Sequence, residues 1–367
     1  MAESGPSYTI AVSRSPGERR AALLRDGSVV EIVHQRDAEV QPGAVYAGRV
    51  GARVPGIDAV FVAIDSGVPG VLKTKAPPPE GTAVAVSVVV PPRPGKGPEL
   101  KAVNHSLVGA TPSVILAPAP DPVVTWWERY ASHVQSVTCD ASREANHLKE
   151  LLGTAPITLH DGSDLFGDLG IDEAIEAALL PDVALPDGGS VIIETTAAVT
   201  AIDINSGASD PATANHAAMA VIARELRKRN LAGHFVVDVI PGKGTAALPR
   251  LLTKAVADDA CPVRVVGTTP LGMIELTRQR LGLSLAEQLL DEGSLSAASV
   301  AYASLRQGVR HALREKSAHL TLTAAPDVVA LLQGPLRPAL NEAGEILKTE
   351  IKLVAAPSFP CATFTCT

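Results

Sequence analysis

Two carboxylates and one amide stand near the ends of expected strands in a single stretch of the chain. Asp203 and Asn205 are two residues apart in AVTAIDINSG, and Asp238 follows in GHFVVDVIPG. An all-oxygen set of this kind suits a hard cation such as Mg²⁺. Such an ion can orient a phosphodiester and activate water as a nucleophile. The alternative is structural: Asp203 and Asn205 close a turn with Ser206-Gly207, and Asp238 is an ordinary strand-end carboxylate.

The elements around these residues predict a βαβ unit. Residues 191–195 and 198–205 are rich in β-branched side chains, which favours strands. Side chains alternate along a strand, so Asp203 and Asn205 share one face. Residues 212–230 have helical periodicity, and residues 235–240 form the next apolar strand. If the two flanking strands are neighbours, the two carboxylates converge near their ends.

Three segments resemble the catalytic core of the ribonuclease E/G family: ETTAAVTAIDINSG, NHAAMAVIARELRKRNLAGHFVVDVI and GMIELTRQRLGLSL. The resemblance runs, with one large gap, from about residue 45 to residue 340. It implies that Asp203 and Asp238 bind magnesium and that Asn205 is the catalytic-site asparagine. It also implies an endoribonuclease of RNA processing or decay that cleaves unpaired, A/U-rich RNA and leaves 5′-phosphate and 3′-hydroxyl ends.

Composition sets broader limits. The 367 residues are 46% hydrophobic and 19% charged, which is typical of a globular chain with two or three domains. We expect no membrane partner and no secretory signal, and the four scattered cysteines indicate a cytoplasmic protein. The net charge of −7 means that RNA binding must depend on local basic patches.

Short alternating strands over residues 45–75 and 82–90 predict a small five-stranded OB barrel. The sequence of this segment resembles the family's S1-type RNA-binding domain. By that resemblance, Phe61 is an RNA-stacking aromatic and Lys96 a basic RNA contact, while Val71 replaces a second aromatic. A core role for Phe61 is the alternative.

Residues 271–281 are predicted to form a helix that places Arg278 and Arg280 at the same end of the sheet as the aspartates. Arginines there could clamp RNA phosphate oxygens. The alternative is a solvated helix face. Further elements are predicted at the following ranges: strands at 8–12, 20–32, 262–267, 320–323 and 351–354, and helices at 141–152, 245–257, 297–316 and 326–332.

The chain departs from the family pattern in several places. A segment that includes the family's Arg-Thr sensor of 5′-monophosphates is missing between about residues 107 and 118. Pro241 stands where the family often has another aspartate. The CPxCxGxG zinc link is absent, so we expect no structural zinc, and any homo-oligomer would form without that link. These departures keep open a catalytically weakened RNA-binding protein. A phosphodiesterase acting on another nucleic acid is a third alternative, because the metal chemistry itself does not select RNA.

The expected fold is mixed α/β (α+β), a compact member of the family. An S1-type OB barrel interrupts a reduced ribonuclease-H-like region, and a DNase I-like catalytic subdomain and a small α/β domain follow. The predicted boundaries are, in order, residues 1–36 and 104–185 for the ribonuclease-H-like region, 37–103 for the barrel, 186–292 for the catalytic subdomain, and 293–367 for the C-terminal domain and tail.

Overall fold

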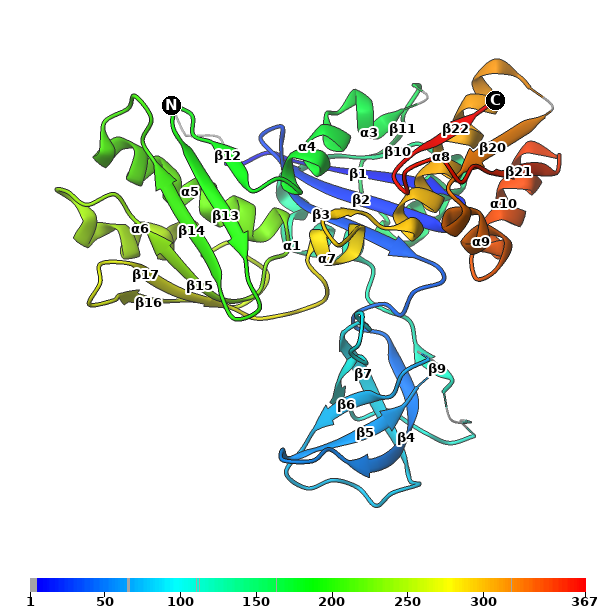
Figure 1. Ribbon diagram of the computed structural model, residues 1–367, viewed down its shortest axis with the longest axis horizontal. Coiled ribbons are helices and arrows are strands. Elements are labelled where there is room, and N and C mark those ends of the chain that lie inside the picture. The colour runs from blue at the N-terminus through cyan, green and yellow to red at the C-terminus, as the bar shows by residue number, and fades with distance from the viewer. Residues whose placement is uncertain (1–4, 65–66, 110, 112, 163, 318) are drawn as a thin grey trace. The chain divides into compact units, whose positions relative to one another are not determined.

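The computed structural model describes the chain except residues 1–4, 65, 66, 110, 112, 163 and 318 (Figure 1). Its contacts divide the chain into two compact units. The first unit comprises residues 1–28, 32–171 and 286–367, and the second comprises residues 29–31 and 172–285. Within the described residues, no helix combines the length and apolar character needed to cross a bilayer. The fold is mixed α/β, as predicted.

The second unit is built on a six-stranded sheet with the order β12-β13-β14-β15-β17-β16. Strands β14 and β15 are parallel neighbours, and helix α5 connects them, so the predicted βαβ unit is confirmed. The bounds are β12 Asp182–Ala184, β13 Ser190–Thr195, β14 Thr200–Asn205, α5 Pro211–Lys228, β15 Gly233–Asp238, α6 Leu248–Ala255, β16 Val263–Thr268 and β17 Ile274–Arg278.

Helix α5 begins where the sequence predicts. The Asp210 side chain accepts a hydrogen bond from the Thr213 backbone N–H, and Pro211 occupies the first turn. Its apolar stripe packs with helix α6 on one face of the sheet (Figure 1). Along β14, buried and exposed residues alternate strictly. The other face of the sheet therefore carries exposed polar side chains.

The predicted helix over residues 271–281 is wrong. This segment forms strand β17, which pairs antiparallel with both β15 and β16. Ile274 and Leu276 are buried and Glu275 between them is exposed, which is the period of a strand. Ile274 and Arg278 are also four residues apart, so the same residues satisfy a helical spacing.

The first unit contains a five-stranded sheet with the order β11-β10-β1-β2-β3, in which β1, β10 and β11 are parallel. The sequence predicted β1 to β3 but not β10. Helices α1 and α2 contact this sheet. The bounds are β1 Tyr8–Ser15, β2 Glu18–Arg25, β3 Ser28–Arg36, α1 Pro122–Tyr130, β10 Val134–Cys139, α2 Ser142–Leu152, β11 Ile157–Leu159 and α3 Leu165–Asp168. Helix α4 (Ile171–Ala178) follows and lies, except for its first residue, in the second unit.

The predicted five-stranded barrel is present in the first unit. Strands β4, β5, β6, β8 and β7 follow one another, and the pairing of β5 with β4 closes the ring, consistent with an OB-like barrel. Strand β9 (Ile115–Ala117) adds to β4. The barrel bounds are β4 Val45–Arg53, β5 Ala59–Ala63, β6 Gly70–Lys73, β7 Ala83–Val90 and β8 Glu99–Ala102.

The C-terminal part packs helices α8 to α10 against a three-stranded sheet of order β21-β20-β22. The elements predicted at 297–316, 320–323, 326–332 and 351–354 are confirmed, whereas α10 and β22 were not predicted. The bounds are α7 Leu285–Leu289, β18 Leu290–Asp291, β19 Ser294–Leu295, α8 Ala297–Glu315, β20 Leu320–Ala324, α9 Pro326–Gln333, α10 Arg337–Leu347, β21 Ile351–Ala355 and β22 Phe364–Cys366.

Candidate active site

The structure brings Asp203, Asn205 and Asp238 together on the exposed face of the second unit's sheet. Asp203 and Asp238 are register partners in the parallel pair of β14 and β15, and both are exposed. Neighbouring strands lie about 4.8 Å apart, so the two carboxylates stand side by side. The Asn205 amide donates a hydrogen bond from Nδ2 to Oδ2 of Asp203 at 3.1 Å. Asn205 thus belongs to the strand and orients Asp203, and the turn begins only after it.

A buried amide that the sequence reasoning missed positions the chain after Asp238. Asn215 on α5 is 3% exposed. Its Nδ2 donates to the Ile240 carbonyl at 2.8 Å, and its Oδ1 accepts from the Ile240 N–H at 3.1 Å. This pair of bonds satisfies the backbone two residues beyond Asp238 and fixes the end of β15. A polar residue on the buried stripe of α5 is the only signal of it in the sequence.

A glycine fixes the end of β14. Gly189 has a φ of 84°, in the region that favours glycine. A Cβ at Gly189 would collide with the backbone oxygen of Asn205 and with the backbone of Ser206. The next residue, Ser190, is the register partner of Asn205 in the β13–β14 pair. The close approach of these two backbones therefore sets the position of Asn205.

The electrostatics of the face favour a cation. Two carboxylates at neighbouring strand positions repel one another unless a proton or a cation lies between them. In the described part of the chain, no group of three or more His, Cys, Asp or Glu side chains is arranged to hold a metal ion. The donor set is therefore two carboxylates and an amide. It fits an ion that keeps several waters, as Mg²⁺ does.

The expected position of Arg278, at the same end of the sheet as the aspartates, is wrong. Arg278 is the register partner of Gly233 at the start of β15, whereas Asp238 is at the end of that strand. Its side chain is 3% exposed and forms a bidentate ion pair with Asp259, at 2.8 and 3.1 Å. Arg278 also donates to the Leu231 carbonyl, so its role in this structure is internal. Arg280 lies two residues beyond Arg278, at the same end of the sheet and away from Asp238, so its expected position is wrong as well. It is partly buried.

The barrel residues named from the sequence lie at its surface. Val60 and Val62 point into the barrel core, and Phe61 between them lies on the opposite side of β5 and is half-buried. Phe61 is the register partner of Val71 in β6. Lys96 is exposed in a tight turn closed by backbone bonds between residues 93 and 96. Lys96 is thus accessible to solvent, and Phe61 is accessible in part.

Comparison with known proteins agrees with the resemblance found in the sequence. Residues 101–281 match the model of the Ribonuclease E/G family. The chain is 36% identical to Ribonuclease E of Nostoc sp. (strain PCC 7120) over 181 residues, which is 44% of this chain and 26% of that protein. It is 38% identical to Ribonuclease E of Escherichia coli over 146 residues, covering 36% of this chain and 14% of the other. It is 29% identical to Ribonuclease G of Salmonella typhimurium over 235 residues, covering 59% and 48%. The chain thus spans less than half the length of each of these relatives.

Proposed function

Since residues 101–281 belong to the ribonuclease E/G family, we propose that this chain is a metal-dependent endoribonuclease that hydrolyses phosphodiester bonds in single-stranded RNA. One observation carries the proposal. Asp203 and Asp238 are aligned on neighbouring parallel strands, with the Asn205 amide bonded to Asp203. Two carboxylates held side by side on an exposed face are suited to phosphoryl-transfer chemistry.

Asp203, Asp238 and Asn205 have distinct roles in the proposed mechanism. The carboxylates of Asp203 and Asp238 would hold Mg²⁺, which when bound supplies charge neutralisation of the phosphodiester and an activated water. Asn205 keeps the Asp203 carboxylate in one orientation. Asn215 and Gly189 act through the backbone, because they fix the ends of the strands that carry the aspartates. The RNA must be unpaired for its phosphodiester to reach this face and the attacking water.

We assign the remaining parts by the same resemblance. The barrel is an S1-type RNA-binding domain in which Phe61 stacks on a base and Lys96 contacts a phosphate. Arg278 and Arg280 are not assigned RNA contacts, because both lie at the end of the sheet away from Asp238. The sheet of β1 to β3 with β10 and β11 is the reduced ribonuclease-H-like region, and the second unit is the DNase I-like catalytic subdomain. The five-part division of the chain stays a prediction.

The test is cleavage of an unpaired, A/U-rich RNA by the wild type and by Asp203→Asn and Asp238→Asn. Each substitution removes one carboxylate charge, and we expect cleavage to fall roughly 100-fold or more while RNA binding persists. Thr268→Ala, an exposed change on β16, is the matched control. Chelation should abolish cleavage, and added Mg²⁺ should restore it. Undiminished cleavage by Asp203→Asn would contradict the assignment.

A catalytically weakened RNA-binding protein is the second candidate. Pro241, where the family often has an aspartate, and the missing 5′-sensor segment favour it. RNA binding in chelator without cleavage after Mg²⁺ is restored would support this candidate over the enzyme. Competition between RNA and DNA oligonucleotides would detect a phosphodiesterase of another specificity.

A further inference from the structure

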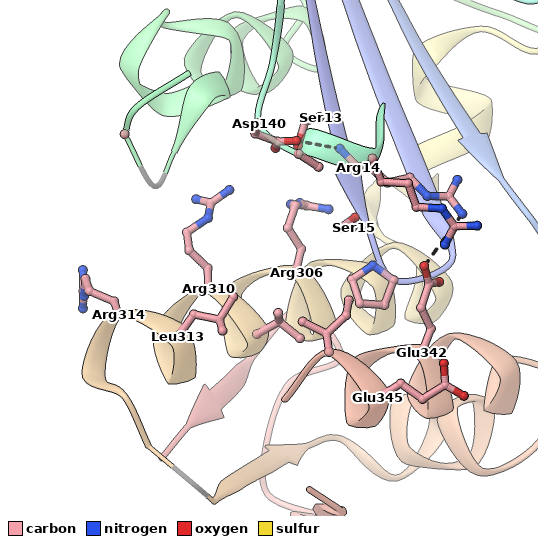
Figure 2. A pocket seen from close by; sticks show the side chains of 16 residues that line it. Ser13, Arg14, Ser15, Asp140, Arg306, Arg310, Leu313, Arg314, Glu342 and Glu345 are labelled. Carbon is pink, nitrogen blue, oxygen red and sulfur yellow. Dashed lines mark hydrogen bonds and ion pairs between the residues drawn. The ribbon is translucent and has the colours of Figure 1, made fainter. Parts of the chain in front are cut away.

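A pocket of about 760 Å³ lies in the first unit, at the carboxyl ends of three parallel strands (Figure 2). Ser13 to Ser15 at the end of β1 line it, Asp140 follows β10, and Gly162 follows β11. Crevices at the carboxyl ends of parallel strands are the usual ligand sites of open α/β sheets. The volume is that of a small-molecule site. Asp203, Asn205 and Asp238 all belong to the other unit.

One wall of the pocket is rich in arginine. Arg306, Arg310 and Arg314 are spaced four residues apart on α8 and so share one face of the helix. Figure 2 shows Arg306 and Arg310 extending from α8 toward the strand ends. Arg306 is held in place by Glu18 at 2.7 Å, and Arg310 by Asp164. Arg14 and Arg143 complete a lining of five arginines.

Carboxylates in and around the lining offset part of this positive charge. There are three carboxylates, and two of them are engaged by backbone N–H groups. Asp140 accepts from the Arg14 N–H at 3.0 Å, and Glu342 accepts from the Gly17 N–H at 2.8 Å. Outside the lining, Asp37, Glu18 and Asp164 pair with Arg14, Arg306 and Arg310. The preference for an anion therefore depends on the exposed Arg143 and Arg314 and on further N–H donors of Arg310. Arginine forks match the geometry of phosphate oxygens.

The floor of the pocket is apolar and partly open to solvent. Leu313 is 57% exposed and Ile346 is 45% exposed, and they come from α8 and α10. Val309 lies between the arginines of α8 and is buried. Large apolar side chains beside arginines suit a ligand that has a flat apolar body as well as an anionic group. A ligand with phosphate alone would leave Leu313 and Ile346 in water.

We propose that this pocket binds a nucleoside monophosphate. Its phosphate contacts Arg310 and Arg314, and its base covers Leu313 and Ile346. Guanidinium planes also stack on flat ring systems, which adds to the fit. The family's 5′ sensor belongs to the segment that is missing between about residues 107 and 118. No lining residue of this pocket lies in that range, so the pocket is a different site. The proposal does not depend on the cleavage activity.

The experiment is isothermal titration calorimetry of the full chain with AMP, adenosine and ribose 5-phosphate. We expect saturable AMP binding, with adenosine and ribose 5-phosphate each at least tenfold weaker, because each lacks one half of the ligand. The double substitution Arg310→Gln and Arg314→Gln should weaken AMP binding at least tenfold. Arg250→Gln, which removes an exposed arginine from α6, should leave it unchanged.

A second variant guards against misfolding, because Arg310 also pairs with Asp164. Leu313→Ser removes part of the exposed floor, and it should weaken AMP binding while ribose 5-phosphate binding stays the same. Circular dichroism establishes that each variant is folded. The proposal is overturned if the wild type shows no saturable AMP binding, if the folded double variant binds AMP as tightly as the wild type, or if ribose 5-phosphate binds as tightly as AMP.

Discussion

At the scale of single residues, the Asn205 amide has a role that can be separated from those of the two aspartates. It donates to Asp203 Oδ2 and so selects one orientation of that carboxylate. We expect Asn205→Ala to lower the rate of RNA cleavage roughly 10- to 100-fold, the range found when a residue that orients a metal ligand is lost. Cleavage kinetics over a Mg²⁺ titration measure this, with Thr268→Ala as the control. An unchanged rate and Mg²⁺ dependence would show that Asp203 needs no such support.

The same residues show how far the sequence predicts the site. Alternation along a strand puts Asp203 and Asn205 on one face, and it needs only the sequence. The alignment of Asp203 with Asp238 depends on which strands pair and in what register, and periodicity does not contain that information. Asn215 was missed because its partner, Ile240, is 25 residues away along the chain. Arg278 was misplaced because its segment is a strand and not the predicted helix, and its register with Gly233 is visible only in the fold.

At the scale of elements, the β13–β14 pair depends on the close approach at Gly189. We expect Gly189→Ala to destabilise the protein by about 1–3 kcal/mol, since alanine would be strained at positive φ and would collide with the Asn205 backbone. Cleavage should fall as well, because Asn205 is displaced. Urea unfolding and cleavage assays measure the two effects. Gly242→Ala is the control, because a Cβ there meets no atom within 4 Å. Equal stability of the two variants would contradict this account.

A buried ionic cluster joins α8 to strands β2 and β3 within the first unit. Glu18 is 1% exposed and bonds to Arg36 at 3.0 Å and Arg306 at 2.7 Å, with His34 at 3.3 Å. Burial alone would raise the pKa of Glu18, but the hydrogen bond and nearby positive charges outweigh it and hold the pKa well below its usual value. Burial lowers the pKa of His34, which is therefore neutral in the fold at neutral pH.

These pKa shifts determine how the free energy of unfolding changes as the pH falls. Because the pKa of His34 is lowered on folding, stability is lost as the pH falls below about 6.5, where the unfolded histidine takes up a proton. The lowered pKa of Glu18 adds a further loss below about 4.3. We expect the free energy of unfolding to decrease across both ranges. Glu18→Gln should cost about 3–5 kcal/mol at neutral pH, since it leaves buried cations without their carboxylate. Urea unfolding between about pH 7.5 and 3 measures the loss of stability with falling pH, and unfolding at neutral pH measures the cost of Glu18→Gln.

Glu315→Gln is the control for this cluster, since Glu315 is exposed on α8. A loss below about 1 kcal/mol in Glu18→Gln would show that the cluster contributes little.

Strands that carry a buried ionic residue are hard to predict from sequence. A buried Glu18 or Arg36 breaks the apolar alternation of its strand, just as Arg278 does in β17. The sequence predicts such strands best where their buried positions are apolar, as with Phe235 and Val237 in β15.

At the scale of the whole molecule, the proposed binding and cleavage residues belong to different units. Phe61 and Lys96 lie in the barrel of the first unit, whereas Asp203 and Asp238 lie in the second. The net charge of −7 gives no general attraction to RNA. Affinity must then come from a few local contacts, and substitutions in the barrel should change RNA binding without removing the chemistry.

The salt dependence of RNA binding tests this view of the whole chain. Each phosphate contact on a single strand contributes about 0.7 to the slope of log Kd against log salt. We expect Lys96→Gln to reduce the slope by about that amount, because one phosphate contact is lost. Fluorescence anisotropy in chelator, between about 50 and 200 mM salt, measures the slope without cleavage. Lys254→Gln, an exposed change on α6, should leave it unaltered. If Lys96→Gln alters neither slope nor affinity, the barrel turn does not contact RNA and the basic contacts lie elsewhere.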